Sequence, residues 1–280
     1  MLCALALSAS CGDGPTRPDP PINPPPPPPP VNTAPVVNSI AVQGTRTNEP
    51  PNFANVSETV AVTASVTDAE TAVEQLQYNW TAPVGTFTGA GARVSWVAPA
   101  SAETPAAVVL TLEIVERYGT NLENRVTKTA NVALHDTAKE VGDMARQFLL
   151  DFSDTTIKDV SRIMQNFGSA AVCPEPNEIL SERNDVINHY TNYRMIESKV
   201  ESATVTINFG GSCPYRGKRG DACAVVPVFW NSIDLRTNVR DSHSGNDIVA
   251  AAYSRNDARW FLCASDYQRL TPFSLVPYPR

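Results

Sequence analysis

The sequence predicts a multidomain chain in which an all-β sandwich is followed by an α+β domain. Apolar and polar side chains alternate through the first region, which is the pattern of half-buried strands. The spacing becomes helical near residue 136 and strands return later, an order typical of α+β domains. A short apolar segment and a proline-rich stretch precede both regions. The predicted divisions are a signal segment (1–11), a linker (12–35), the sandwich (36–135) and the α+β domain (136–280).

The N-terminal segment places a short apolar run and two small residues before Cys11, as signal peptides do before their cleavage site. Residues 4–14, A-L-A-L-S-A-S-C-G-D-G, resemble a bacterial lipoprotein signal. The resemblance implies a lipid on Cys11 and an exported protein anchored in the cell envelope, in the outer membrane and periplasm or at the cell surface. Two features depart from the pattern: no basic residue precedes Arg17, and Ser8 replaces the usual aliphatic residue. An ordinary secretory signal, with Cys11 incidental, is the alternative.

The linker holds half of the chain's 24 prolines, including the unbroken run 24–30. Proline fixes φ and lacks an N–H, so this segment enters neither a helix nor a sheet ladder. We expect an extended polyproline II spacer. Recognition by aromatic grooves is the other role of such segments. Beside a membrane-attachment cysteine, the spacer role is favoured.

The charge and motif content excludes several classes of function. A net charge of −7 and a pI near 5.0 argue against nucleic-acid binding, which requires a concentrated basic face. No C-x-x-C pair or H-E-x-x-H motif is present, so the sequence predicts neither a metal site nor a cofactor. Arg216, Lys218 and Arg219 form a basic stretch in this acidic chain, predicted to be a solvated tip or, alternatively, a contact for anionic polymers.

Four cysteines lie after residue 170 and predict two disulfides in an exported chain. Cys213 and Cys223 bracket a hairpin sequence, so the facing strand ends bring them within bridging distance. Cys173 and Cys263 then pair by elimination. Four cysteines allow three pairings, so the assignment is a prediction.

Residues 36–135 predict several short strands separated by turn signals, the pattern of a β-sandwich. Lys128 breaks the alternation of the last strand, which indicates a strand end or a sheet edge where its charge reaches water. The apolar sets expected to face inward are Val60, Val62, Ala64 and Val66; Leu76, Tyr78 and Trp80; Val94 and Trp96; Val108, Leu110, Leu112 and Ile114; and Val126, Ala130, Val132 and Leu134.

The stretches V-T-A-S-V-T-D-A-E, Y-N-W-T-A-P-V-G-T-F, V-S-W-V-A-P and L-T-L-E-I-V-E-R are similar to bacterial polycystic-kidney-disease (PKD) repeats and related immunoglobulin-like domains. The resemblance implies that Trp80 is the core tryptophan between the sheets. Asp68 and Glu70 stand where some relatives hold calcium, but two carboxylates are too few, so a solvated turn is expected. Domains of this kind act as spacers or as adhesion and binding modules, and the fold alone does not decide between them.

Residues 136–280 predict three helices followed by a meander of strands. Asp136, Thr137 and Glu140 form a capping-box start for the first helix. The helical sets are Val141, Met144, Ala145, Phe148, Leu149 and Phe152; Ile157, Val160, Ile163, Met164 and Phe167, ended by Gly168; and Val186, Ile187 and Tyr190, in a helix beginning near Ser181. The predicted strands are 203–209, 224–235 and 247–253, the last paired with 259–267.

This element order and the closing strand A-R-W-F-L-C-A-S-D-Y resemble the nuclear transport factor 2-like fold, in which a curved antiparallel sheet wraps a helical layer around a conical pocket. Ketosteroid isomerases and polyketide cyclases of that fold use a pocket carboxylate or histidine as general base. The corresponding candidates are His189, Tyr190 and Tyr193 on the third helix, Trp230 and Asp234 on a strand, Trp260 on the last strand, and His243 with Asp247 in a loop. None stands in a spacing typical of an active site, and no catalytic residue is assigned.

Three functions remain open from the sequence. The first is a non-enzymatic, lipid-anchored protein whose spacer and sandwich display a module that binds a small apolar ligand or an envelope protein. The second is a tethered isomerase- or cyclase-like enzyme, and the third is a purely structural or adhesive surface protein. A closed pocket with an ionisable side chain favours the enzyme, whereas filling by Phe148, Trp230 or Trp260 removes it.

Overall fold

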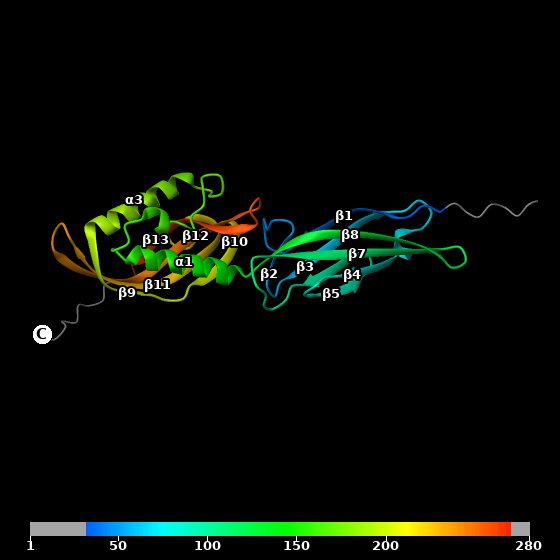
Figure 1. Ribbon diagram of the computed structural model, residues 1–280, viewed down its shortest axis with the longest axis horizontal. Helices are drawn as coiled ribbons and strands as arrows, with labels where there is room; N and C mark the ends of the chain where they lie inside the picture. The colour runs from blue at the N-terminus through cyan, green and yellow to red at the C-terminus, as the bar shows by residue number, and fades with distance from the viewer. Residues whose placement is uncertain (1–31, 270–280) are drawn as a thin grey trace, which may run out of the picture. The chain divides into compact units, whose positions relative to one another are not determined.

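The structure is a computed structural model that describes residues 32–269 (Figure 1). The predicted signal segment, its Cys11 and nearly all of the proline-rich linker lie outside the described residues. The described residues are rich in β-structure: two four-stranded sheets come first, and three helices with a curled five-stranded sheet follow.

The first sheet has the strand order β1-β3-β6-β5, with neighbours antiparallel. Its strands are β1 (Val36–Gln43), β3 (Thr59–Thr67), β5 (Thr86–Ala90) and β6 (Arg93–Val97). The second sheet has the order β2-β8-β7-β4, in which only the β2–β8 pair is parallel. Its strands are β2 (Phe53–Asn55), β4 (Gln77–Thr81), β7 (Ala106–Tyr118) and β8 (Leu122–His135), with the short 3-10 turn η1 (Val73–Gln75) before β4.

The two sheets share a core of alternate side chains, as the period-two pattern predicts. Val60 and Val62 of the first sheet and Leu110 and Leu134 of the second are fully buried in it. The fully buried tryptophan of the core is Trp96, which the prediction did not single out. Trp80 also packs against this core and contacts Phe87 of the other sheet, but it is only half-buried because its strand, β4, is at the edge of the second sheet.

Lys128 lies at a sheet edge, as its break in the alternation predicts. On one side β8 pairs with β7 along its whole length, but on the other side β2 reaches only residues 133–135. At Lys128 the far side of β8 therefore has no strand neighbour, and the lysine is exposed. An exposed lysine at such an edge discourages pairing with another chain.

The second half of the described chain packs three helices against one antiparallel sheet with the order β10-β11-β12-β13, to which β9 adds along the far part of β11. The helices are α1 (Thr137–Ser153), α2 (Val160–Ile163) and α3 (Pro176–Asn192). The strands are β9 (Tyr193–Val200), β10 (Thr204–Ser212), β11 (Arg219–Asp234), β12 (Val239–Ser254) and β13 (Arg259–Arg269).

Helix α1 begins as predicted. The Asp136 side chain accepts from the Lys139 N–H, and Glu140 accepts from the Asp136 N–H, so the two side chains cap the first turn reciprocally. Its apolar face lies across the curled sheet and contacts β9, β10, β11 and β13 (Figure 1). The core between them contains Val141, Ala145 and Phe148 of α1.

Several element predictions need correction. The second helix is a single turn, α2, because Asp159 caps it at one side and the chain turns after Ile163 to bridge Phe167 with Leu262. The third helix begins at Pro176, not near Ser181, since proline suits the first helical turn. Strand β9 was not predicted because half-exposed and exposed residues dominate it.

Both halves belong to one compact unit and share part of a core. Phe53 of β2 is fully buried, stacks on His135 with ring centroids 5.2 Å apart, and meets Phe209 and Trp260 edge-on. The Thr137 N–H also donates to the Asn55 side chain across the same junction. The first half therefore supplies a side chain to the core of the second.

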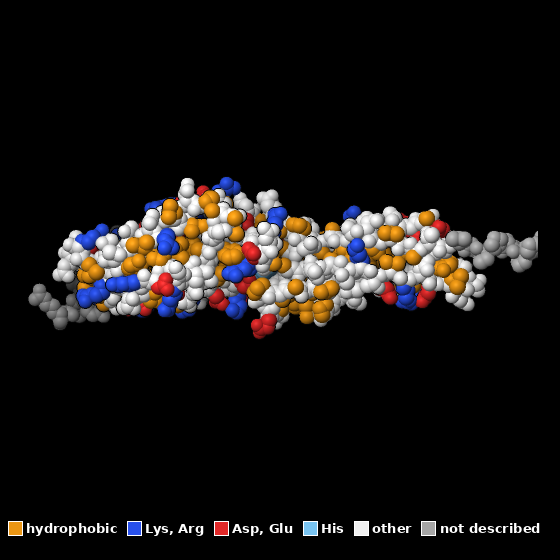
Figure 2. Space-filling model, turned by 45° about the horizontal axis from the view of Figure 1, so that its top comes forward, with side chains coloured by type: hydrophobic (Ala, Val, Ile, Leu, Met, Phe, Trp, Pro, Cys, Tyr) orange, Lys and Arg blue, Asp and Glu red, His pale blue; other side chains and the backbone are white. Residues whose placement is uncertain are grey.

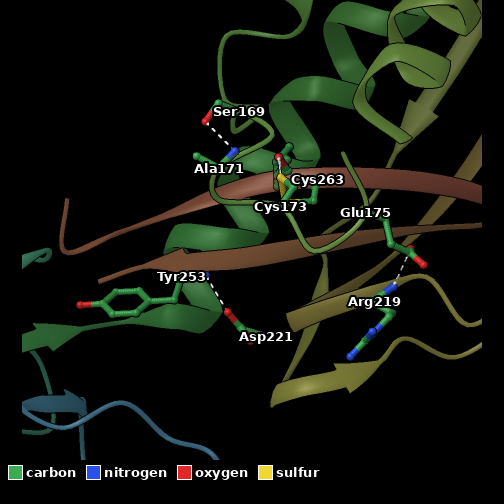
Figure 3. Close-up of a disulfide and its surroundings, with 9 residues drawn as sticks. Ser169, Ala171, Cys173, Glu175, Arg219, Asp221, Tyr253 and Cys263 are labelled. Atoms are coloured by element: carbon green, nitrogen blue, oxygen red, sulfur yellow. Dashed lines mark hydrogen bonds between the residues drawn. A yellow bond between two sulfur atoms is a disulfide. The ribbon is translucent and has the colours of Figure 1, made fainter. Parts of the chain in front are cut away.

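The structure forms the two predicted disulfides, Cys213–Cys223 across the β10–β11 hairpin and Cys173–Cys263 between the segment before α3 and β13. Figure 3 shows the second bridge, with Glu175 nearby accepting from the Arg219 N–H. Disulfides persist in oxidising compartments, so the bridges indicate a protein that folds outside the cytoplasm. No helix within residues 32–269 is long and apolar enough to cross a membrane.

The two disulfides should contribute unequally to stability. Their sequence separations are 90 residues for Cys173–Cys263 and 10 for Cys213–Cys223. Because a longer closed loop restrains the unfolded chain more, alanine replacement of the long-range pair should cost about 4–5 kcal/mol and replacement of the short-range pair about 3 kcal/mol. Urea unfolding of the two double variants beside the wild type measures both values. Equal losses, or a larger loss from the short-range pair, would contradict this ranking.

Candidate functional site

A pocket of about 170 Å³ lies between α1, α3 and the sheet of the second half. Its apolar wall comes from α1, through Phe148, Leu149 and Phe152. The other lining residues are Glu182 and Asp185 of α3, Trp230 of β11, Asp247 of β12, and Ser265, Asp266 and Tyr267 of β13. Four carboxyl groups and two polar aromatic side chains thus meet an apolar helix face in one cavity.

Asp247 lies at the base of this pocket. It stands on β12 between Val226 of β11 and Tyr267 of β13, and only 4% of its surface is exposed. Its Oδ1 atom has no hydrogen-bond partner among the described residues. Burial, with smaller contributions from the negative charges of Glu182 and Asp266, raises the pKa of Asp247 to about 8. The cavity therefore contains a buried carboxyl that is protonated at neutral pH.

Glu182 joins α3 to the outer strand of the sheet. Its two carboxylate oxygens accept from the Ser265 N–H at 2.6 Å and from the Ser265 hydroxyl at 2.9 Å. Strand β13 is the edge of the sheet, so this contact satisfies an amide that no neighbouring strand can pair. Burial, with a smaller contribution from Asp185, raises the pKa of Glu182 to about 7, although the Ser265 hydrogen bonds and Lys218 oppose the shift.

Aromatic rings form another part of the pocket lining. The rings of Trp230 and Tyr267 stack with centroids 5.4 Å apart, and Phe152 approaches Trp230 at 5.8 Å. Gly245 makes room for this stack, because a Cβ there would lie 2.8 Å from the Tyr267 hydroxyl. The Trp230 Nε1–H and the Tyr267 hydroxyl both lack a hydrogen-bond partner among residues 32–269. The pocket thus offers unpaired donors and acceptors beside aromatic faces.

His189 lies behind the pocket and not in its lining. Its ring stacks on Phe152 with centroids 4.1 Å apart and on Tyr193 at 5.6 Å. Burial lowers the pKa of His189 to about 4, so the ring is neutral at pH 7. It contacts both Phe152 and Trp230, two side chains of the pocket lining, and so supports the aromatic wall.

Of the predicted pocket residues, Trp230 and Asp247 line this cavity. Tyr190 packs against the core of the second half, and Trp260 lies in the cluster around Phe53, where it is 1% exposed. Trp260 is therefore a core residue of the junction. Tyr193 is the first residue of β9 rather than part of α3.

Asp234 lies at the end of β11, away from the cavity, and pairs with Arg236 at 2.7 Å. Hydrogen bonds from Arg236 lower the pKa of Asp234 to about 2, and the Arg236 guanidinium also donates to the Tyr193 hydroxyl. His243 and Asp247 belong to strand β12 and not to a loop. The polar run S-H-S-G-N-D concealed this strand because such residues are typical of turns.

The basic loop between β10 and β11 finds acidic partners in the chain itself. Lys218 pairs with Glu178 of α3, and Arg216 pairs with the pocket residue Asp266 at 3.3 Å. The Arg219 N–H donates to Glu175, as Figure 3 shows. The predicted solvated tip is found for Arg216 and Arg219, which are exposed, whereas Lys218 is half-buried and neutralises Glu178 of α3.

Several lining residues were not recognised in the sequence, and one of them carried a usable signal. Glu182 stands one turn before Val186, on the stripe that packs inward, which is an unusual place for a carboxylate. Asp247 was a predicted candidate, and its parity with the buried Val249 and Ala251 indicates a strand rather than the expected loop. Asp266 and Tyr267 gave no such signal, because their neighbourhood depends on how β13 lies beside α3.

A larger, more open cavity of about 530 Å³ lies beside Tyr253 and Arg255, lined otherwise mainly by proline, alanine and asparagine. Arg255 is the one charged side chain in its lining, so it offers less chemistry than the acidic pocket. On the face drawn in Figure 2, basic, acidic and apolar side chains are interspersed. Such mixing is typical of a solvated surface.

The acidic pocket therefore has the chemistry to hold a small ligand or to exchange a proton with one. Within residues 32–269, no three His, Cys, Asp or Glu side chains converge in the manner of a metal site. No protein-family model, no curated protein and no solved structure matches the chain.

The buried carboxyls should leave a mark on stability. Unfolded Asp and Glu titrate near about 4, whereas in the folded protein the pKa is about 8 for Asp247 and about 7 for Glu182. Between these values the folded state binds more protons than the unfolded state, so the free energy of unfolding should fall from about pH 4 to about pH 8 and then level off.

Urea unfolding across that range measures the slope. Asp247→Asn, whose side chain does not ionise, should flatten the part between pH 7 and pH 8. Asp143→Asn removes an exposed carboxylate of α1 and should leave the slope unchanged. An Asp247→Asn profile as steep as that of the wild type would show that Asp247 does not titrate in this range.

Proposed function

We propose that this protein is an exported, lipid-anchored component of a bacterial cell envelope that displays a non-enzymatic ligand-binding module. In this proposal Cys11 carries the lipid and the proline-rich segment is the spacer. The sandwich is an immunoglobulin-like, PKD-type domain, and the second half is a binding domain of the nuclear transport factor 2-like kind. The two disulfides support export.

The observation that carries the binding function is the acidic pocket. Its buried Asp247 and Trp230 have polar atoms without partners among the described residues, and such atoms are costly unless something binds them. Phe148, Leu149 and Phe152 give the lining an apolar part, as in most small-molecule sites. The occupant is therefore expected to be a small molecule with an apolar body and a polar end, rather than a wholly apolar one.

A tethered enzyme is the second candidate, and one observation favours it. A carboxyl with a pKa of about 8 is suited to donate or accept a proton near neutral pH. Phe148 and Trp230 line the cavity without filling it, so the pocket stays open to a substrate. Binding is preferred because His189, the natural partner for proton transfer, lies behind the aromatic wall. Chemical conversion of a bound ligand, lost in Asp247→Asn, would establish the enzyme instead.

Binding in the pocket is tested with a set of neutral, cationic and anionic fragments. We expect members of the set to shift the backbone amide resonances of Asp247 and Ser265 in ¹H–¹⁵N spectra. Ser265→Leu fills the cavity and should abolish these shifts, while Ser161→Leu, on the exposed side of α2, should leave them unchanged. A wild-type pocket that no fragment enters would refute the binding function.

The anchor is tested separately by metabolic labelling with a palmitate analogue. The wild type should be labelled and recovered with membranes, and Cys11→Ala should be neither, because a thiol is required to carry the lipid. Cys3→Ala is the matched control and should label like the wild type. Equal labelling of the wild type and Cys11→Ala would contradict anchoring through Cys11.

A further inference from the structure

We propose that the ligand of the acidic pocket is a small organic cation that carries a protonated primary amine. This inference rests on the binding function proposed above and names the ligand class. It follows from three properties of the lining: the sign of its charge, the kind of atoms left unpaired, and the faces of its aromatic rings.

The charge of the lining is acidic. Four of the ten lining residues, Glu182, Asp185, Asp247 and Asp266, are acidic, and none is basic. Arg216 and Lys218 approach from outside and pair with Asp266 and with Glu178, which leaves Asp247 without a cationic partner among the described residues. Carboxyl groups so close together repel one another when ionised, and a cation among them relieves that repulsion.

The unpaired atoms match the donors of an ammonium group. Asp247 Oδ1 and the Tyr267 hydroxyl oxygen, on paired residues of β12 and β13, can each accept a hydrogen bond, and both lack a partner among residues 32–269. A primary ammonium has three N–H donors and no acceptor, so it can satisfy both. A quaternary ammonium has no donor and would leave them unpaired. The Trp230 Nε1–H requires an acceptor, which places an oxygen elsewhere on the ligand.

The aromatic wall and the size of the cavity favour an organic cation over a bare metal ion. Trp230 and Tyr267 present stacked rings to the pocket, and ring faces attract ammonium groups. A volume of about 170 Å³ is the space of about six liquid water molecules at roughly 30 Å³ each. A molecule of a few carbons with an amine at one end fits that space.

The binding should depend on pH through Asp247. The ionisable groups facing it are Glu182 and Asp185 from α3, Asp266 and Tyr267 from β13, and His243 along its own strand; α1 contributes only Phe148, Leu149 and Phe152. The amine remains protonated below about pH 10. Binding therefore requires loss of the Asp247 proton, and affinity should rise roughly a hundredfold from pH 6 to pH 9.

The test uses 3-aminopropan-1-ol and 1,3-propanediol, which differ only in an ammonium against a hydroxyl group. Each compound is titrated into the full-length protein at pH 6, 7.5 and 9. The shifts of the backbone amide resonances give the dissociation constants. We expect the amine to bind at least about tenfold tighter than the diol at pH 9, with the pH dependence above, and Asp247→Asn to remove this preference. Asp143→Asn is the matched charge control and should retain it.

Tetramethylammonium and calcium chloride complete the set. Weaker binding of tetramethylammonium than of the amine supports the donor argument, and equal binding overturns it. If calcium displaces the amine and shifts the same amide resonances, the carboxylates bind a metal ion instead.

If the diol or other neutral and anionic fragments bind while the amine does not, the ammonium inference fails and the binding function stands. If nothing in either set enters the pocket, both fail.

Discussion

The acidic pocket exists because α3 is attached to the edge strand β13 by polar and covalent contacts instead of lying flat on the sheet. Helix α3 buries only Val186 among its apolar side chains, so hydrophobic packing alone holds it weakly. The Cys173–Cys263 disulfide lies just before the helix, Lys218 pairs with Glu178 in its first turns, and Glu182 accepts two hydrogen bonds from Ser265. These contacts keep the helix at the edge of the sheet and leave a cavity above Asp247.

The same contacts set the electrostatics of the pocket. The Ser265 amide has no strand partner, and Glu182 accepts its hydrogen bond. The buried Glu182 carboxylate also places negative charge near Asp247. The fold therefore carries two carboxyls whose ionised forms are disfavoured in the folded state. Replacing Asp247 by an apolar residue would remove that cost without disturbing any hydrogen bond that Asp247 makes to the described residues. A residue that opposes stability in a well-formed cavity is more readily explained by binding than by folding.

Local sequence patterns were sufficient to predict most of the helices and strands, but they did not predict the pocket. Alternation located β3, β6 and β7, the capping residues located the start of α1, and the hairpin sequence paired Cys213 with Cys223. Each of these depends on residues close together in the chain. Which tryptophan is fully buried between the sheets depended instead on strand order: Trp96 stands on the interior strand β6, while Trp80 stands on the edge strand β4.

The pocket residues required the same long-range information. Asp247, Glu182 and Tyr267 come from three elements, and only the pairing of β12 with β13 and the position of α3 bring them together. Glu182 and Asp247 each place a carboxylate where the apolar pattern predicts an inward-facing side chain. That signal was visible in the sequence. Strand β9 shows the opposite case, since its exposed surface left no periodic pattern to recognise.

The sandwich is more than a spacer in physical terms, because Phe53 completes the core of the second half. Its ring is fully buried against His135, Phe209, Tyr253 and Trp260, and those side chains would lose that cover without it. His135 is the last residue of β8 and Asp136 caps α1, so the connection has no free linker in which the two halves could turn independently. Apolar contacts between domains resist relative motion more than polar ones, so Phe53 couples the two halves through their shared core.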